Sequence, residues 1–198
     1  MGAQLWRTGP DSRDKWENML IVIDYNAELH KYAGPNAWND MCMLSVGMYG
    51  KGETRWIKGT GSTDIEYQTQ MSIWSIMAAP LTASCDLRNM NESTKQILMN
   101  EEVIAVNQDT LGKQAQRIIN NDTWNVFVKP LSNGDHVVAI LNRSEDSHNY
   151  QINFEDIGLP DKYEIRDLWE HEVTDKGKKW QGQILGHETK LFRLKRIK

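Results

Sequence analysis

The sequence predicts an α/β region followed by an antiparallel β domain within 198 residues. Helix-like and strand-like segments alternate as far as about residue 112, which is the order of an α/β barrel or a doubly wound sheet. Beyond that point, short segments of period-two alternation follow one another with turn residues between them. We therefore expect a division between residues 1–116 and residues 117–198.

The helices of the first region are predicted from apolar spacing and from capping sequences. Between residues 14 and 29, apolar side chains recur at the i, i+3, i+4 and i+7 spacing of one helix face. These are Trp16, Met19, Leu20 and Ile23. Residues 63–66 fit a capping box and predict a helix over 64–78. A second capping box at 93–96 predicts another helix, and a short one is expected over 102–106.

Three parallel strands are expected to alternate with these helices, near residues 3–7, 38–44 and 81–86. The second segment is short, apolar and bounded by Gly and Pro residues. The third is rich in small residues, as a tightly packed parallel sheet requires. Residues 50–62 have no hydrophobic period and predict a long loop.

The second region carries clear strand signals. Residues 124–129 and 136–141 are strand-like runs that flank an Asn-Gly pair within residues 132–135, which suits a tight hairpin. Residues 150–154 and 190–194 alternate between apolar and polar side chains. Residues 117–198 are therefore expected to form an antiparallel β domain.

Composition excludes several classes of partner and cofactor. The formal net charge of −4 and the pI of about 5.7 offer no broad basic surface for nucleic acid. The longest apolar run is much shorter than the roughly 20 residues of a membrane-spanning helix. Cys42 and Cys85 have no neighbouring Cys or His at zinc-ligand spacing. We expect no nucleic-acid partner, no membrane segment, no metal and no organic cofactor, and the sequence predicts no compartment.

Two clusters of polar residues are candidates for chemistry. Asp11 follows Gly9-Pro10, which blocks a helix, so its carboxylate is expected in a loop at a strand end. On charge alone, Arg7 and Asp11 could equally be a surface ion pair. Residues 34–44 combine a turn, an indole and paired polar groups, which is the composition of a sugar-binding rim.

Four motifs, in this order and at this spacing, resemble glycoside hydrolase family 27, the α-galactosidases or melibiases and the related α-N-acetylgalactosaminidases. They are Trp6-Arg7 with Asp11 and Trp16, Gly34-Pro35-x-x-Trp38-Asn39-Asp40-x-x-Met43-Leu44, Ala79-Pro80-Leu81 with Asp86-Leu87-Arg88, and Val103-Ile104-Ala105-Val106-Asn107-Gln108-Asp109 with Leu111-Gly112-Lys113-Gln114. The resemblance implies the C-terminal half of a (β/α)8 TIM barrel followed by an antiparallel β-sandwich.

The resemblance also implies a reaction and a set of site residues. The family hydrolyses terminal α-linked galactose with retention of configuration, which requires a nucleophilic carboxylate and an acid/base carboxylate. Asp11 matches the acid/base. Arg7 and Met43 match residues that contact the sugar. The supporting residues of the strand-end loop are matched by Trp38, Asn39 and Asp40.

Two departures from the family pattern change what is expected. Cys42 stands where the family has a sugar-contacting Asp, and a thiol is a weaker hydrogen-bonding group than a carboxylate. No residue matches the nucleophile, and neither Asp40 nor Asp86 is at its position. We therefore expect an inactive fragment of a retaining exo-α-galactosidase, which would need the N-terminal half of the barrel as partner. The alternative is a non-catalytic carbohydrate-binding or interaction module.

Overall fold

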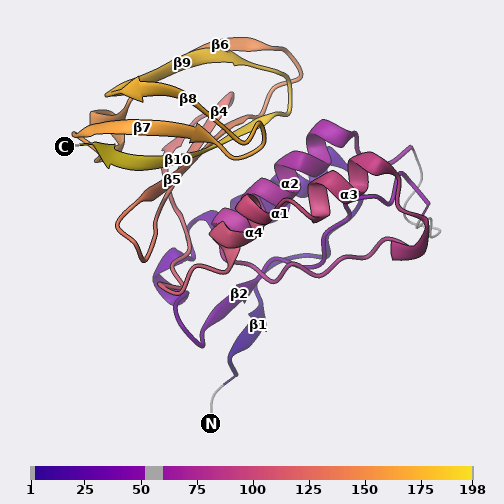
Figure 1. Ribbon diagram of the computed structural model, residues 1–198. Coiled ribbons are helices and arrows are strands. Elements are labelled where there is room, and N and C mark those ends of the chain that lie inside the picture. The colour runs from indigo at the N-terminus through magenta and orange to yellow at the C-terminus, as the bar shows by residue number, and fades with distance from the viewer. Residues whose placement is uncertain (1–2, 52–59, 198) are drawn as a thin grey trace.

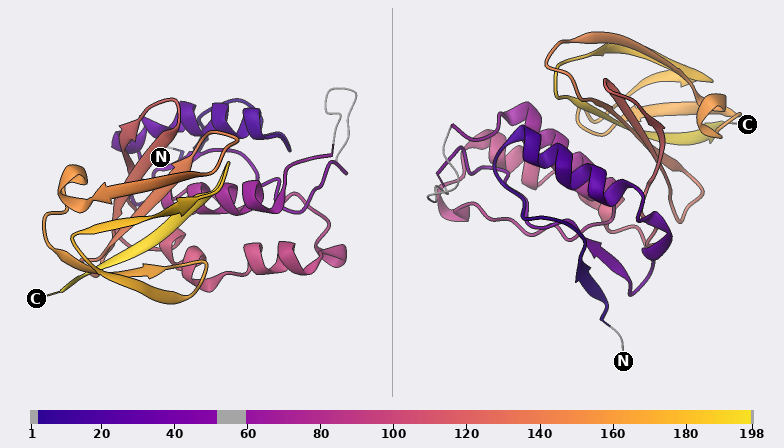
Figure 2. Two further views of the ribbon diagram at one scale, coloured as in Figure 1. Left: turned by 90° about the horizontal axis from the view of Figure 1, so that it is seen from above. Right: turned by 180° about the vertical axis from the view of Figure 1, so that it is seen from behind.

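The computed structural model describes residues 3–51 and 60–197, and it shows helices lying between a small parallel sheet and an antiparallel β-sandwich (Figures 1 and 2). The strands β1 and β2 lie at one side of the helices, near the N-terminus, and the sandwich lies at the other. This arrangement confirms the expected fold class, part of an α/β barrel followed by an antiparallel β-sandwich. Residues 52–59 of the loop expected over 50–62 lie outside the described residues.

The parallel sheet is smaller than the sequence predicts. β1 (Leu5–Arg7) pairs with β2 (Trp38–Asp40), and α1 (Trp16–Ala27) connects them. The prediction of a third strand over 81–86 was wrong, because this segment makes only one isolated parallel bridge, between Leu44 and Ala83. A parallel strand needs consecutive hydrogen bonds to a neighbouring strand. Because β2 already ends at Asp40, Ala83 bridges only Leu44, in the segment that follows β2.

The remaining helices lie against one another and against the sandwich. They are α2 (Asp64–Ile76), α3 (Glu92–Leu98) and α4 (Glu101–Asn107), with 3-10 turns at His30–Tyr32, Leu87–Asn89 and Phe154–Ile157. The capping box of α2 is confirmed: Thr63 N donates to Glu66 Oε2 at 2.7 Å, and Glu66 N donates to Thr63 Oγ1 at 3.3 Å. The second predicted box was wrong, because Asn91 rather than Ser93 caps α3.

The sandwich has two sheets of unequal size. One sheet has the order β3-β4-β5-β10-β7-β8, and the other pairs β6 with β9, all antiparallel. Their bounds are β3 Gln116–Asn120, β4 Trp124–Pro130, β5 His136–Asn142, β6 His148–Asn153, β7 Lys162–Asp167, β8 Glu172–Gly177, β9 Lys179–Ile184 and β10 Thr189–Ile197. The hairpin expected at 132–135 is confirmed between β4 and β5, where Gly134 has a φ of 87°.

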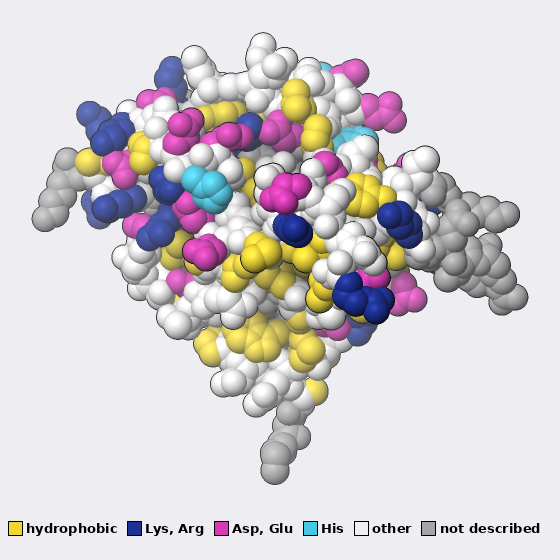
Figure 3. Space-filling model, turned by 45° about the vertical axis from the view of Figure 1, so that its right-hand side comes forward, with side chains coloured by type: hydrophobic (Ala, Val, Ile, Leu, Met, Phe, Trp, Pro, Cys, Tyr) yellow, Lys and Arg dark blue, Asp and Glu magenta, His cyan; other side chains and the backbone are white. Residues whose placement is uncertain are grey.

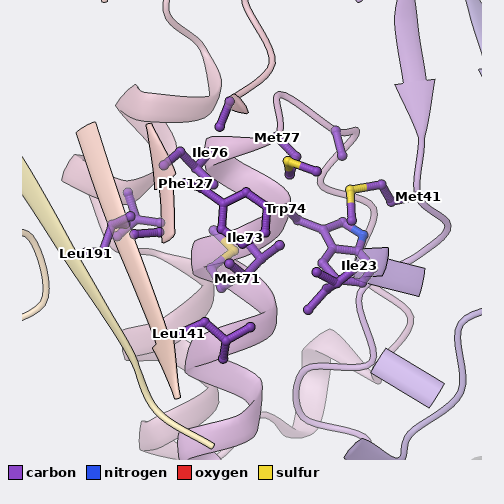
Figure 4. Close-up of a cluster of buried hydrophobic side chains, with 14 of the residues drawn as sticks. Ile23, Met41, Met71, Ile73, Trp74, Ile76, Met77, Phe127, Leu141 and Leu191 are labelled. Carbon is purple, nitrogen blue, oxygen red and sulfur yellow. The ribbon is translucent and has the colours of Figure 1, made fainter. Parts of the chain in front are cut away.

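The central strands of the six-stranded sheet are buried on both faces. Val138 and Ile140 of β5 face the two-stranded sheet, in a cluster with Ile152 of β6 and Trp180 of β9. The alternate residues of the same strands face α2, where Phe127, Leu141 and Leu191 join the core around Trp74 (Figure 4). The helical region and the sandwich therefore share one continuous core, which explains the nearly unbroken apolar run of β5.

Ion pairs reinforce this packing at its edge. Asp24 of α1 accepts hydrogen bonds from Arg117 of β3 at 2.7 Å and from Arg143, just after β5, at 2.8 and 2.9 Å. Burial alone would raise the pKa of Asp24, but the bonds and charges of the two guanidinium groups outweigh it and hold the pKa below its ordinary value. No helix among the described residues is long and apolar enough to span a membrane.

Candidate active site

The two parallel strands carry the predicted site residues to the same edge. Arg7 and Asp40 are register partners at the carboxyl ends of β1 and β2. The chain then turns at Pro10, and Arg7 Nη2 donates at 2.9 Å both to the Pro10 carbonyl and to Asp11 Oδ1. The side chain of Asp11 is 87% exposed, so its carboxylate projects from the loop toward solvent. In barrel enzymes, this end of the strands is where the active site lies.

These residues line an open cleft of about 680 Å³. Arg7, Asp11, Asp40, Cys42 and Met43, which the sequence indicated as site residues, all lie in its wall. The other lining residues are Leu5, Ser12, Arg13, Pro80 and Thr82. The structure therefore brings together five of the seven residues that the sequence singled out.

The loop after β2 is fixed from two sides. Cys42 N donates to Asp40 Oδ1 at 2.8 Å, and the Cys42 carbonyl accepts a 2.8 Å bond from Trp74 Nε1 in the core. Cys42 has a φ of 78° and is 8% exposed, so its thiol borders the cleft without projecting into solvent. Met43 is 49% exposed. Asp40 thus holds the loop in the conformation that turns Met43 outward.

Asn39 lies on the opposite face of β2 and is buried. Its side chain accepts a 3.1 Å bond from Trp6 Nε1 and donates to Gln114 Oε1 at 2.8 Å and to the Leu29 carbonyl at 3.0 Å. Gln114 in turn donates to the Asn26 carbonyl at the end of α1. Asn39 therefore supports the site from behind, by tying β1, β2 and the segment before β3 together.

Trp38 does not reach the cleft that contains Asp11. It pairs with Leu5, two residues before the Arg7–Asp40 pair, which is about 6.5 Å along the strands. There it lines a neighbouring hollow, and a Cβ on Gly112 would meet its ring at 3.0 Å. Gly112 has a φ of 61°, so both its conformation and its lack of a side chain suit this contact. Trp38 therefore lies beside the cleft that contains Asp11, in a hollow that shares Leu5 and Pro80 with it.

The loop that carries Asp11 is anchored on both sides of it. Asn18 Nδ2 donates to the Asp11 carbonyl at 3.2 Å, which ties the loop to α1. Asp14 is buried, and its Oδ1 accepts bonds from Ser62 N at 2.9 Å and from the Tyr67 hydroxyl at 2.8 Å. Burial, together with this bond to Asp14, raises the pKa of Tyr67 well above its ordinary value. The Asp11 backbone is thereby held in place while its carboxylate stays accessible.

Sequence reasoning missed the cleft residues Ser12 and Thr82. Ser12 is adjacent to Asp11, and Thr82 follows the Ala79-Pro80-Leu81 motif, so their places beside known motifs were the available signal. Asp86 is not in the cleft; it caps the 3-10 turn Leu87–Asn89 and bonds Arg88. Among the described residues, no cluster of three His, Cys, Asp or Glu side chains has the geometry of a metal site.

Exposed apolar side chains adjoin the cleft. Figure 3 shows hydrophobic side chains gathered on the lower part of one face, toward the N-terminus. Leu5 of β1 is 48% exposed, close to the value of Met43. Leu5, Arg7, Trp38 and Asp40 project to the same side of the two strands, away from the buried Asn39. In a closed barrel this side is the interior.

Two parallel strands with a paired carboxylate and guanidinium at their carboxyl edge have the arrangement found in part of an α/β barrel. Comparisons with known proteins identify the family. Residues 2–109 match the α-galactosidase A family model, Melibiase_2, and residues 121–194 match the α-galactosidase C-terminal β-sandwich domain. The chain belongs to the α-galactosidase family of glycoside hydrolases, family 27.

Curated relatives agree with this assignment. Alpha-galactosidase 2 of Arabidopsis thaliana is 38% identical over 196 residues, which are 98% of this chain and 47% of the relative. Alpha-N-acetylgalactosaminidase of Gallus gallus is 34% identical over 179 residues, which are 86% of this chain and 42% of the relative. The chain thus spans less than half the length of these relatives.

Solved structures show the same fold. A putative alpha-galactosidase/melibiase from Bacteroides fragilis is 37% identical with a TM-score of 0.91, over 97% of this chain and 42% of that one. A β-L-arabinopyranosidase from Geobacillus stearothermophilus is 28% identical with a TM-score of 0.88, over 98% and 46%.

Proposed function

We propose that residues 1–198 supply the acid/base side of the active site of a retaining exo-α-galactosidase. The observation that carries this proposal is the Arg7–Asp11 pair, bonded at 2.9 Å in a cleft at the carboxyl ends of β1 and β2. The substrate class is a terminal α-linked galactose on an oligosaccharide or glycoconjugate. Family membership and the printed names of the relatives support this choice.

Asp11 is the proposed acid/base. Its exposed carboxyl group would donate a proton to the departing glycosidic oxygen and then take one from the incoming water. Arg7 bonds both Asp11 and the Pro10 carbonyl, so it holds the carboxylate in one direction as well as offering donors to sugar hydroxyls.

The rest of the cleft would bind the sugar ring. Met43 offers a partly exposed apolar side chain, and Ser12 and Thr82 offer hydroxyl groups. Cys42 offers only a weakly hydrogen-bonding thiol at the position where the family has an Asp. We propose that this replacement weakens recognition of one sugar hydroxyl and leaves ring packing as the larger share of binding in this half of the site.

The second carboxylate of the retaining mechanism is proposed to come from outside the described residues. Among those that line the cleft, Asp11 and Asp40 are the carboxylates, and Asp40 is engaged with Cys42 N. Retaining enzymes hold their two carboxyl groups about 5–5.5 Å apart on opposite sides of the sugar. We propose the N-terminal half of the barrel as the partner, because the side of β1 and β2 that carries Leu5 and Trp38 is open here.

Turnover of an aryl α-galactoside tests the proposal. Residues 1–198 alone should give no turnover above background, and addition of the N-terminal half of a close relative should restore it. In the mixture, Ser144→Ala is a matched control remote from the cleft and should leave the rate unchanged. Turnover by residues 1–198 alone that survives Asp11→Asn would contradict the assignment.

The alternative is a non-catalytic carbohydrate-binding module, and the open cleft with a single projecting carboxylate is what favours it. The same mixture distinguishes the two functions. A module would bind galactose, yet it would restore no turnover with any N-terminal half.

A further inference from the structure

A second hollow, remote from the cleft with Asp11, lies where the sandwich meets the helices. Its volume is about 480 Å³, within the roughly 300–1,000 Å³ range of small-molecule sites. The N-terminal part of α2 and one side of α3 form two of its walls, and the β7–β8 turn over residues 168–171 forms the third. We call it the accessory hollow.

Trp169 gives this hollow a fixed aromatic wall. Its Nε1 donates to Ser72 Oγ at 2.9 Å, and its ring packs against the shared core while remaining partly exposed. Because the N–H is already bonded inside the protein, the indole cannot rotate freely and presents apolar surface to the hollow. A rigid, partly exposed indole is suited to packing against the C–H face of a sugar ring.

Polar groups surround the indole. The side chains of Gln68, Ser93 and Gln96 line the hollow and make no hydrogen bond to another described residue. Each amide carries two donors and an acceptor. His171 bonds Glu102 through Nδ1 at 2.7 Å, which leaves Nε2 for a ligand. The hollow therefore offers several free hydrogen-bond donors and acceptors around the apolar face of the Trp169 indole.

The charge of the lining narrows the class of ligand. Asp64 is the acidic residue in the wall, and neither Lys nor Arg is among the described lining residues. An anionic ligand would meet a carboxylate without a compensating cation. A flat apolar ligand would cover the half-buried amide of Gln68 without offering it a hydrogen-bond partner. A neutral ring with several hydroxyl groups satisfies both the indole and the amides.

We propose that the accessory hollow is a binding site for a neutral hexose, separate from the cleft that contains Asp11. Residues of the helical region and of the β domain both contribute to it, so a bound sugar would bridge the two. The site does not depend on the proposed reaction, since it contains none of the residues Arg7, Asp11 or Met43.

Titration of the 198-residue chain with D-galactose, followed by ligand-detected NMR, tests this proposal. An Arg7→Met background removes the guanidinium of the cleft, so that saturable binding reports the accessory hollow. In that background, Gln68→Leu with Gln96→Ala should weaken binding about five- to tenfold. Gln151→Ala, an exposed amide on β6, is the matched control and should change nothing.

The indole has its own pair of variants. Trp169→Ala should weaken binding at least tenfold, whereas Trp169→Phe keeps an aromatic plate and should bind within about threefold of the parent. Thermal melts of both variants show whether the fold is retained. Absence of saturable binding in the Arg7→Met background, or binding unchanged by the paired glutamine substitutions, would overturn the proposal.

Discussion

Lys129 is a buried lysine whose environment makes it a reporter of the packing between the sandwich and α4. Its ammonium donates to the Val106 carbonyl at 2.7 Å, in the last turn of α4. Burial lowers its pKa from 10.5 to about 8, and the negative charge of Asp109 opposes this shift. The lysine thus satisfies a helix-end carbonyl at an electrostatic cost.

The first prediction follows from that lowered pKa. Between about pH 8 and pH 10.5 the unfolded chain binds the proton that the folded chain has released, so the stability of the parent rises with pH in this window. Relative to Lys129→Met, the parent should gain about 3 kcal/mol of unfolding free energy across it. Urea unfolding of both proteins between pH 7.5 and 10.5 measures this gain. A constant difference between them would show that Lys129 is solvated.

Single residues of the site were predictable where a motif fixed them. Arg7, Asp11, Cys42 and Met43 lie in the cleft because their motifs place them at strand ends. Trp38 lines the adjacent hollow, because a motif gives order along the chain, whereas the two-residue offset from Asp40 along β2 decides which hollow a side chain lines.

At the level of elements, the start of α3 differs between the sequence pattern and the structure. The sequence suggests a capping box at Ser93, yet Asn91 is the N-cap and its Oδ1 accepts from Thr94 N at 2.8 Å. Both residues are good caps, so local pattern cannot choose between them. The choice is made by packing, since this start buries Thr94 and Ile97.

The second prediction compares Asn91 with Ser93. Asn91→Ala should cost about 1 kcal/mol of unfolding free energy, because a backbone N–H loses its acceptor. Ser93→Ala, the matched control, should change it by less than about 0.5 kcal/mol. Chemical denaturation of both variants is sufficient. An equal loss from the two would place the helix start at Ser93.

In the β domain, strands were predicted where apolar residues dominate, in β4 and β5, or where they alternate with polar residues, in β6 and β10. β4 and β5 were evident, because β5 is covered on both faces. β3, β7, β8 and β9 were not singled out, although the alternation of Tyr163 and Ile165 in β7 was a usable signal. The edge strand β8, Glu172–Gly177, is almost wholly exposed and carries several charges, so its pairing with β7 depends on backbone bonds that leave no hydrophobic pattern.

At the scale of the whole molecule, we propose residues 1–116 and 117–198 as its two domains, and ion pairs join them. Glu102 of α4 bonds Arg166 of β7 at 2.6 and 2.8 Å, and His171 bonds the same carboxylate. The bonds from Arg166 lower the pKa of Glu102 to about 2, with a smaller contribution from His171 and with partial burial opposing both.

The third prediction concerns acid stability. Because the pKa of Glu102 is lowered in the folded state, its contribution is present above its ordinary value of 4.5 and is lost as pH falls toward about 2. Glu102→Gln should therefore cost about 1–2 kcal/mol at pH 7, after allowance for solvent screening, and almost nothing near pH 2. Glu101→Gln is the matched neighbour and should have little effect at either pH. A pH-independent loss would indicate packing instead of charge.

The fourth prediction concerns the open side of the parallel sheet. β1 pairs with β2 on one edge, and Leu5 and Met43 are each about half exposed. Residues 1–198 alone should bind a hydrophobic dye and self-associate, since such a surface and a free strand edge favour association. Leu5→Lys should reduce both effects, whereas Leu185→Lys, on an exposed loop of the sandwich, should not. Light scattering and dye fluorescence measure them. A monomer that does not bind the dye would show that the side of the sheet carrying Leu5 is covered.

The role of Asp11 as acid/base is the central claim, and its most direct test is the dependence of the rate on the leaving group. Residues 1–198, with Asp11 or with Asp11→Asn, are mixed with the N-terminal half of a close relative. The mixture is assayed on α-galactosides whose leaving groups range from activated aryl groups to sugars. The account predicts a loss of about 10²–10⁴-fold for the poor leaving groups and a much smaller loss in glycosylation for the activated ones, which need no protonation. A loss of equal size for every leaving group, or no loss at all, would contradict it.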